Sequence, residues 1–132
     1  MPARILVIED NPESLELIAY LLEAYGHTVL KATDGEEGLQ IALREKFDLI
    51  ICDLQMPKLD GFEVIGRIRT SVDIENTPVV AITAYAMRED LERVMAAGFN
   101  GYITKPIAPE DFVSQTEQFL KRDLRSNGLS PT

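Results

Sequence analysis

Charged and hydroxyl side chains stand where the apolar segments of this chain end. Asp53 closes one such segment, Glu9 and Asp10 follow another, and Thr83 and Lys105 follow two more. Three carboxylates held close together repel one another unless a cation lies among them. Their oxygen atoms suit Mg²⁺, which takes one or two carboxylates together with waters and phosphate oxygens. A hydroxyl and an ammonium group would hold the remaining phosphate oxygens, so these residues predict phosphate chemistry assisted by Mg²⁺.

These residues can act together only if the fold brings the ends of their segments to one place. Five short apolar segments, at 5–8, 28–32, 48–53, 79–82 and 101–104, alternate with five helical patterns. This alternation predicts an α/β fold, a five-stranded parallel sheet flanked by five helices in the flavodoxin-like, doubly wound manner. The strand order 2-1-3-4-5 suits a chain of this length and makes the first and third strands neighbours. Glu9, Asp10 and Asp53 are then expected to meet at the carboxyl edge of the sheet.

Local signals mark the ends of the predicted helices. Asn11 and Pro12 open the first helix as N-cap and first helical residue, and Asp34 with Glu37 predicts a capping box for the second. The fourth helix is expected to bury an apolar face made of Met87, Leu91, Val94 and Met95. We assign residues 1–122 to one domain and residues 123–132 to the end of the last helix and a flexible C-terminal tail.

Composition excludes several classes of protein. Thirteen basic and 22 acidic residues give a net charge of −9, which argues against a nucleic-acid surface. No apolar segment approaches the length of a membrane span, and no signal peptide precedes the first strand. The single cysteine, Cys52, lies inside an apolar segment and is expected in the core. We expect a cytoplasmic protein without membrane partners, in which the lone His27 is solvated.

The motifs at the strand ends resemble those of the receiver domain of bacterial two-component response regulators. The resemblance covers about residues 3–122. It rests on Ile-Leu-Val-Ile-Glu-Asp at 5–10, Asp-Leu-Ile-Ile-Cys-Asp-Leu-Gln-Met-Pro at 48–57 with Gly61, Val-Ala-Ile-Thr-Ala at 80–84, and Lys-Pro at 105–106. Within the family, the stretches 81–87 and 102–107 resemble stand-alone, DivK-like regulators and receivers of hybrid kinases.

The resemblance implies a role for each residue at the predicted edge. Asp53 would accept a phosphoryl group from a phosphohistidine of a sensor histidine kinase or a histidine phosphotransfer protein. Mg²⁺ would be held by Asp10, Asp53 and the backbone carbonyl of Gln55, and by Glu9 through a water. Thr83 and Lys105 would hold the phosphoryl oxygens, and the Lys105–Pro106 peptide bond would be cis.

The resemblance also implies how the signal is read and how long it lasts. Thr83 and Tyr102 would form the switch, whose movement carries the signal to a downstream protein. Contact would be made through the face of the fourth helix, fifth strand and fifth helix, around the residues Met87, Glu89, Arg93, Tyr102 and Phe112. Weak self-association through the same face stays open. Gln55 and Tyr85 would flank the approach of water to the phosphoryl group and tune its lifetime. Because neither ionises as a base near neutral pH, we expect slow dephosphorylation, with Tyr85 as the larger brake.

The leading prediction is a phosphorylation-dependent switch or relay that signals by protein–protein contact and is not an enzyme beyond its own phosphorylation and slow dephosphorylation. A receiver belonging to a hybrid sensor kinase is the alternative within the family.

A flavodoxin-like cofactor binder is the alternative from another class, since the fold alone does not decide function. It requires a phosphate loop rich in Ser, Thr and Gly after the first strand, whereas this chain has Glu-Asp-Asn-Pro at 9–12. A phosphatase acting on small molecules would need an acid where Gln55 stands.

Overall fold

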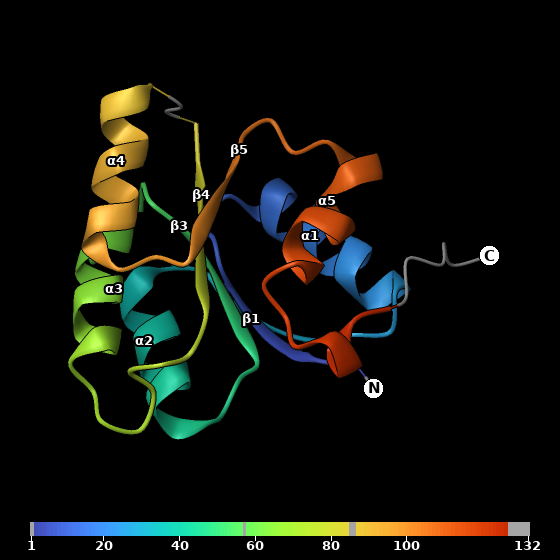
Figure 1. The fold of residues 1–132 in the computed structure, drawn as a ribbon, viewed down its shortest axis with the longest axis horizontal. Helices are drawn as coiled ribbons and strands as arrows, with labels where there is room; N and C mark the ends of the chain where they lie inside the picture. Colours follow the sequence, from blue (N-terminus) through green and yellow to red (C-terminus); the bar gives the residue numbers. More distant parts are fainter. Residues whose placement is uncertain (1, 57, 85–86, 127–132) are drawn as a thin grey trace.

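The computed structural model describes residues 2–56, 58–84 and 87–126. Within them, five parallel strands form one sheet in the order β2-β1-β3-β4-β5, as predicted (Figure 1). The strands are β1 (Arg4–Ile8), β2 (Thr28–Ala32), β3 (Leu49–Asp53), β4 (Val79–Thr83) and β5 (Gly101–Thr104). The helices are α1 (Pro12–Ala24), α2 (Gly35–Arg44), α3 (Gly61–Arg69), α4 (Arg88–Ala97) and α5 (Pro109–Glu117), followed by the short 3₁₀ helix η1 (Arg122–Leu124).

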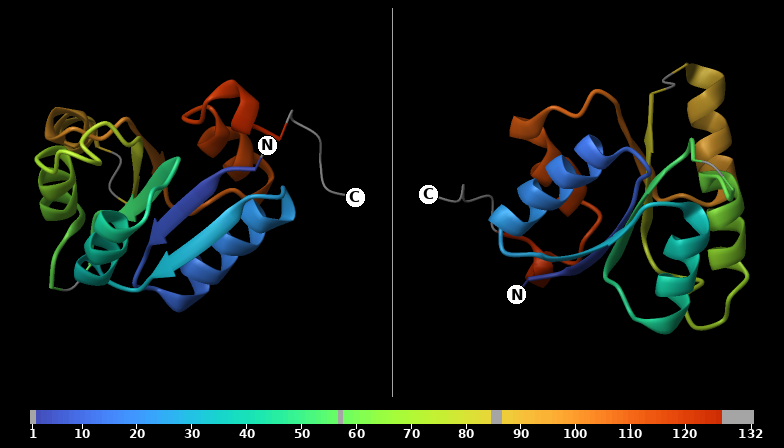
Figure 2. Two further views of the ribbon diagram at one scale, coloured as in Figure 1. Left: turned by 90° about the horizontal axis from the view of Figure 1, so that it is seen from below. Right: turned by 180° about the vertical axis from the view of Figure 1, so that it is seen from behind.

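Helices cover both faces of the sheet. Helices α1 and α5 lie on one face, and α2, α3 and α4 lie on the other (Figures 1 and 2). Two apolar cores result, one on each side of the sheet. The central strands β3 and β4 are buried along their whole length, because both of their faces are covered. Cys52 of β3 lies in one of these cores, as expected.

Side chains close the helix starts much as the sequence predicts, with one difference. Asn11 Oδ1 accepts the Ser14 N–H at 3.0 Å, and Pro12 is the first helical residue of α1. Asp34 Oδ1 accepts the Glu37 N–H at 2.8 Å, but Glu37 Oε1 bonds the Thr33 N–H at 2.7 Å instead of completing the box.

The complete capping box lies at the start of α3. Asp60 Oδ1 accepts the Glu63 N–H, and Glu63 Oε1 accepts the Asp60 N–H. Asp60 therefore fixes the point where the loop after Asp53 becomes a helix, because both backbone donors at that start are satisfied.

The last helix is shorter than predicted. Helix α5 ends at Glu117, and the chain turns back through η1 instead of continuing as a helix past residue 122. Arg125 donates hydrogen bonds to the carbonyl oxygens of Leu120 and Gln118, both at 3.1 Å. Residues up to 126 are thus held against the domain, and the predicted flexible tail lies, from residue 127 onward, outside the described residues.

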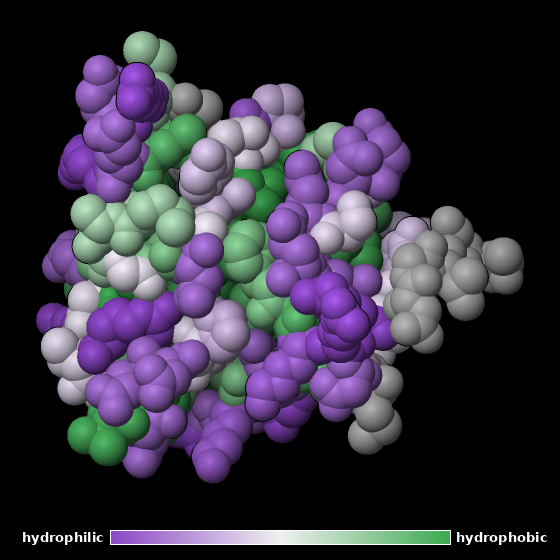
Figure 3. All heavy atoms as spheres, in the orientation of Figure 1, coloured by the Kyte–Doolittle hydropathy of each residue, from purple (hydrophilic) through white to green (hydrophobic). Residues whose placement is uncertain are grey.

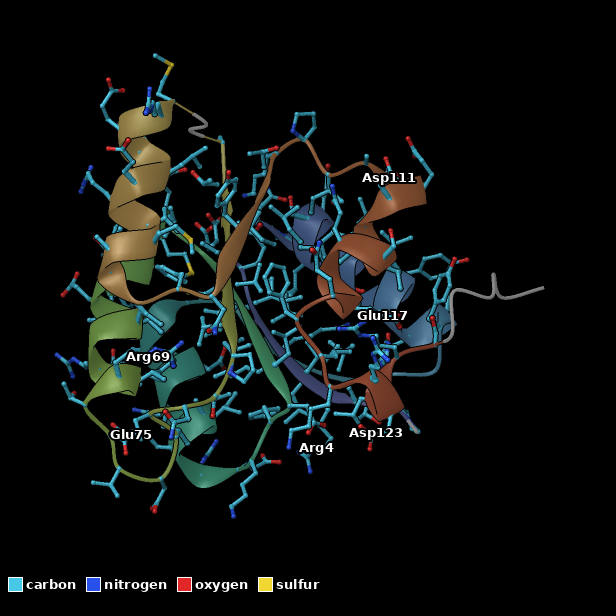
Figure 4. The ribbon with its side chains drawn as sticks, viewed as in Figure 1. Arg4, Arg69, Glu75, Asp111, Glu117 and Asp123 are labelled. Atoms are coloured by element: carbon cyan, nitrogen blue, oxygen red, sulfur yellow. The ribbon has the colours of Figure 1, made fainter. Side chains whose placement is uncertain are left out.

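His27 is buried, so the prediction that it is solvated is wrong. Its Nδ1 accepts the Ala3 N–H at 3.0 Å, which leaves the proton on Nε2, 2.7 Å from Glu117 Oε2. Glu117, labelled in Figure 4 at the end of α5, also accepts the Ser126 N–H at 3.0 Å and the Ser126 hydroxyl at 2.9 Å. This buried network joins the start of β1, the start of β2 and the end of α5.

Among the described residues, no helix is long and apolar enough to cross a membrane. The location in the cytoplasm stays a prediction.

The buried network at His27 yields a first prediction. His27→Ala should lower the free energy of unfolding by about 3 kcal/mol, because it leaves the buried Ala3 N–H without its partner and removes one of the two donors to Glu117 Oε2. Urea unfolding followed by circular dichroism measures the change. Ser126→Ala, which removes a single hydrogen bond at the edge of the network, is the matched control and should cost about 1 kcal/mol. Equal losses in the two variants would contradict a central role for His27.

Candidate functional site

The acidic residues predicted to meet do lie together. Strands β1 and β3 pair in parallel, with Ile8 opposite Cys52, so the residues that follow them emerge side by side. Glu9, Asp10 and Asp53 each offer a carboxylate oxygen, and these three oxygens lie within 4.8 Å of one another. Asp10 is exposed, whereas Glu9 and Asp53 are buried. The carboxyl edge of the sheet therefore carries an open acidic cluster.

Lys105 binds two of these acids at once. Its Nζ lies 3.0 Å from Asp53 Oδ2 and 2.9 Å from Glu9 Oε1. Burial lowers the pKa of Lys105, but its close pairing with the acidic groups of Glu9 and Asp53 outweighs that effect and raises the pKa. Lys105 is thus held as a cation. It follows β5, and the Lys105–Pro106 peptide bond is cis, as the resemblance implied.

Glu9 keeps capacity for a further ligand. It is 0% exposed, and its Oε2 accepts the Asn11 N–H at 3.2 Å. Its Oε1 faces Lys105 closely enough for an ion pair, yet no partner with hydrogen-bond geometry reaches that buried oxygen within the described part of the chain. Burial raises the pKa of Glu9 to about 7, with neighbouring Asp53 adding to the rise while Lys105 and the Asn11 N–H oppose it.

A divalent cation fits this donor set. Carboxylate oxygens from Glu9, Asp10 and Asp53 converge there, one of them buried without a hydrogen bond, and hard oxygen donors are the ligands that Mg²⁺ prefers. A cation would also offset the burial and the neighbouring Asp53 that together raise the pKa of Glu9.

The loop after β3 is shaped around Asp53. Asp53 Oδ1 accepts the Gln55 N–H at 3.1 Å, which fixes the carboxylate from the side opposite Lys105. Gly61 opens α3 directly against this loop, where a Cβ would lie 2.7 Å from the Asp53 carbonyl oxygen. A side chain at position 61 would therefore displace the loop that carries Gln55.

Thr83 and Tyr102 lie on neighbouring strands. Thr83 ends β4 and is buried, and Tyr102 of β5 is paired with Ala81, two residues before Thr83. The Tyr102 side chain is 39% exposed, so its ring lies at the surface of the edge strand. Tyr85, the second residue predicted to tune the lifetime, lies outside the described residues.

One residue of the predicted output surface needs correction. Phe112 is fully buried on the inner side of α5, so it cannot contact a partner. Arg93 is exposed, and its guanidinium lies 5.1 Å from the centroid of the Phe62 ring, on the side of α4 that faces α3. Met87, at 68% exposed, and Met95 are at the surface although the sequence predicted them in the core; of the predicted face only Val94 is fully buried. In the view of Figure 3, apolar residues gather between α4 and α5, in the region of β4 and β5.

Sequence reasoning missed a cavity beside the acidic cluster. Its volume is about 240 Å³, and its walls combine strand ends with side chains of α3 and α4, namely Leu54, Gln55, Asp60, Phe62, Thr83, Asp90 and Arg93. No spacing within the sequence brings Phe62 and Arg93 together, because α3 and α4 become neighbours only through the sheet.

Comparison with known proteins gives one consistent answer. A family model described as response regulator receiver domain matches residues 5–117. The polar-differentiation response regulator DivK of Brucella anthropi is 34% identical over 120 residues, which cover 91% of this chain and 98% of that protein. The chemotaxis response regulator CheY4 of Vibrio cholerae has a TM-score of 0.87 at 29% identity, covering 91% of this chain and all of that one. The receiver domain of the sensor histidine kinase PA1611 from Pseudomonas aeruginosa, solved with a magnesium ion coordinated in its active site cleft, has a TM-score of 0.82 at 30% identity, covering 90% and 98%.

The raised pKa of Glu9 predicts how the stability of the metal-free protein depends on pH. The pKa is about 7 in the folded chain and 4.5 as the ordinary value, so the folded protein binds more protons between these two pH values. The contribution of Glu9 to stability is therefore complete below pH 4.5 and lost as the pH rises through 7. Glu9→Gln, which resembles the protonated form, should gain stability relative to the parent protein over this range.

Urea unfolding in excess chelator at several pH values measures the difference between the two proteins. The same series with saturating Mg²⁺ is the control, because a bound cation should restore the stability of the parent protein at high pH. A stability difference that stays constant from acid to neutral pH without metal would contradict the raised pKa.

Proposed function

Since this chain belongs to the family of response regulator receiver domains, we propose that Asp53 is its phosphoacceptor and receives the phosphoryl group from a phosphohistidine of a sensor kinase or phosphotransfer protein. Members of this family act in phosphorylation-dependent signalling. The observation that carries the proposal is the position of Asp53, whose carboxylate belongs to the acidic cluster and lies 3.0 Å from Lys105 Nζ. The match also displaces the flavodoxin-like alternative.

The residues around Asp53 suit phosphoryl transfer. In this reaction the protein contributes chiefly by positioning the groups and by neutralising charge on the phosphoryl oxygens. A carboxylate oxygen of Asp53 attacks phosphorus, and the bond from phosphorus to the donor nitrogen breaks. The Gln55 N–H and Lys105 Nζ hold the Asp53 carboxylate in place beforehand, at 3.1 and 3.0 Å. Lys105 then bonds a phosphoryl oxygen, as does the hydroxyl of Thr83.

The metal ligands proposed are Asp10, Asp53 and the backbone carbonyl of Gln55, with Glu9 acting through a water. Mg²⁺ bound there would supply positive charge in addition to that of Lys105. The acidic cluster supports this assignment, as does the magnesium ion in the PA1611 receiver. Glu9 would orient the water through the oxygen that lacks a hydrogen bond.

The signal is proposed to leave through the face formed by α4, β5 and α5. A phosphoryl group adds negative charge and new hydrogen-bond acceptors, which draw the Thr83 hydroxyl inward, and Tyr102 follows that movement. The exposed Met87, Met95 and Tyr102 give this face the apolar character that a protein partner requires. Both single-domain regulators and receivers of histidine kinases are among the similar proteins, so either context is compatible with this output.

The phosphoacceptor assignment predicts the outcome of chemical phosphorylation. Incubation with phosphoramidate and Mg²⁺ should add one phosphoryl mass to the protein, and Asp53→Asn should abolish that addition, as read by intact mass spectrometry. Asp10→Ala should lower both the rate of labelling and the affinity for Mg²⁺, because it removes the exposed carboxylate of the cluster. Asp48→Asn, which alters the acid at the other end of β3, is the matched control. Labelling of Asp53→Asn at the parent rate would move the site elsewhere.

The output face predicts where phosphorylation changes the structure. Hydrogen exchange of the phosphorylated protein should change along α4 and β5 relative to Asp53→Asn under the same conditions. Tyr102→Ala should leave the labelling of Asp53 intact and reduce the change in exchange, because it removes the ring that follows Thr83. Tyr20→Ala, an exposed tyrosine on α1, is the control. Changes restricted to α2 and α3 would contradict the proposed face.

A further inference from the structure

The cavity beside the acidic cluster begins at residues that adjoin Asp53 along the chain and across the sheet. In phosphoryl transfer the attacking and leaving atoms are roughly in line with phosphorus, so the leaving group departs on the side away from Asp53. Leu54 and Gln55, which follow Asp53, and Thr83 of the neighbouring strand form one wall of the cavity. Helices α3 and α4 supply the opposite wall, which includes Arg93.

Arg93 is held over an aromatic ring instead of in an ion pair. Its guanidinium lies 5.1 Å from the Phe62 ring centroid, an attractive cation–π distance. No carboxylate of the described residues lies within ion-pair distance of Arg93, although Asp60 and Asp90 line the same cavity. The guanidinium therefore keeps its planar set of donors for a ligand, and that geometry matches a carboxylate.

The two acids of the cavity are compensated locally. Asp60 is the N-cap of α3, where its Oδ1 accepts the Glu63 N–H at 2.9 Å. Asp90 lies in the first turn of α4. Each carboxylate thus stands at the positive end of a helix dipole, which stabilises its charge. Arg93 lies past the first turn of α4, so its positive charge has no such local compensation.

From this arrangement we infer that Arg93 forms a subsite for the carboxylate leaving group of acyl phosphates, and so makes them preferred low-molecular-mass phosphodonors. The inference rests on the proposed role of Asp53 as phosphoacceptor. The Asp53 carboxylate forms the new oxygen–phosphorus bond, and the bond from phosphorus to the acyl oxygen breaks. The electron pair leaves with the carboxylate product, no proton is transferred, and Arg93 binds the negative charge that develops on that oxygen.

Donors with a nitrogen leaving group would not benefit from this subsite. Phosphoramidate releases ammonia, and a phosphohistidine releases an imidazole, neither of which carries negative charge for Arg93 to bind. The arginine therefore separates two classes of donor by the charge of the group that leaves.

The test compares acetyl phosphate with phosphoramidate on the whole chain with Mg²⁺, by the rate at which intact mass increases. Arg93→Gln should lower kcat/KM for acetyl phosphate roughly tenfold, the effect expected for losing a hydrogen bond to a charged group. The rate with phosphoramidate should stay within about twofold of the parent protein. Arg93→Lys, which keeps the charge but not the planar donors, should restore part of the rate. Arg88→Gln, whose parent side chain pairs with Glu92 on the exposed part of α4, is the matched control.

Each outcome decides the matter. Equal loss with both donors would assign Arg93 to folding or to transfer in general, and no loss with either donor would remove the subsite; both results overturn the inference. If the parent protein takes no phosphoryl group from either donor, the role of Asp53 itself fails. Labelling by phosphoramidate in both proteins, with acetyl phosphate unaffected by Arg93→Gln, leaves the phosphoacceptor in place and refutes only the subsite.

Discussion

The contact of Lys105 with Glu9 and Asp53 is the interaction on which the functional edge depends. Two buried carboxylates lie within 3.0 Å of one ammonium group, and a third carboxylate, that of Asp10, lies close by. Acids that are buried together repel one another and lose hydration, which appears here as the raised pKa of Glu9. One lysine offsets part of this cost and leaves the rest for a bound cation to offset. The carboxyl edge of the sheet therefore carries an excess of negative charge that a bound cation would neutralise.

At the opposite end of the sheet, the protein itself provides the hydrogen-bond partners of two charged side chains, Glu117 and Arg69. Glu117 accepts three hydrogen bonds from His27 and Ser126. Arg69, labelled in Figure 4, donates to the carbonyl oxygens of Gly98, Glu75 and Thr77 and to the Asn100 side chain, and so ties α3 to the end of α4 and the start of β4. A rigid end of this kind lets the other end carry unsatisfied groups without loss of the fold.

Helix α4 runs between these two ends, and its side chains face the core, the solvent and the cavity next to α3. Val94 packs in the core, Met87 and Met95 face solvent, and Arg93 lies over Phe62 beside the cavity. The helix therefore buries little apolar surface for its length, which favours small shifts of its position over shifts of the central strands. A helix so lightly anchored is suited to transmit a change at Thr83, and its side facing α3 is suited to contact the donor.

The sequence by itself determined the strands, their order and the residues at the carboxyl edge. Uninterrupted apolar segments require burial on both faces of the sheet, and their alternation with helices restricts the topology to few forms. The sequence alone therefore placed Glu9, Asp10, Asp53, Thr83 and Lys105 at the carboxyl edge. Periodicity failed where burial depends on neighbours in space: Met95 of α4 and Met87 just before it are exposed, and α5 stops at Glu117. Only the tertiary structure decided that His27 meets Glu117, ninety residues away, and that Arg93 meets Phe62. Such contacts are set by the packing of helices on the sheet, and no local pattern of residue types records which side chains that packing brings together.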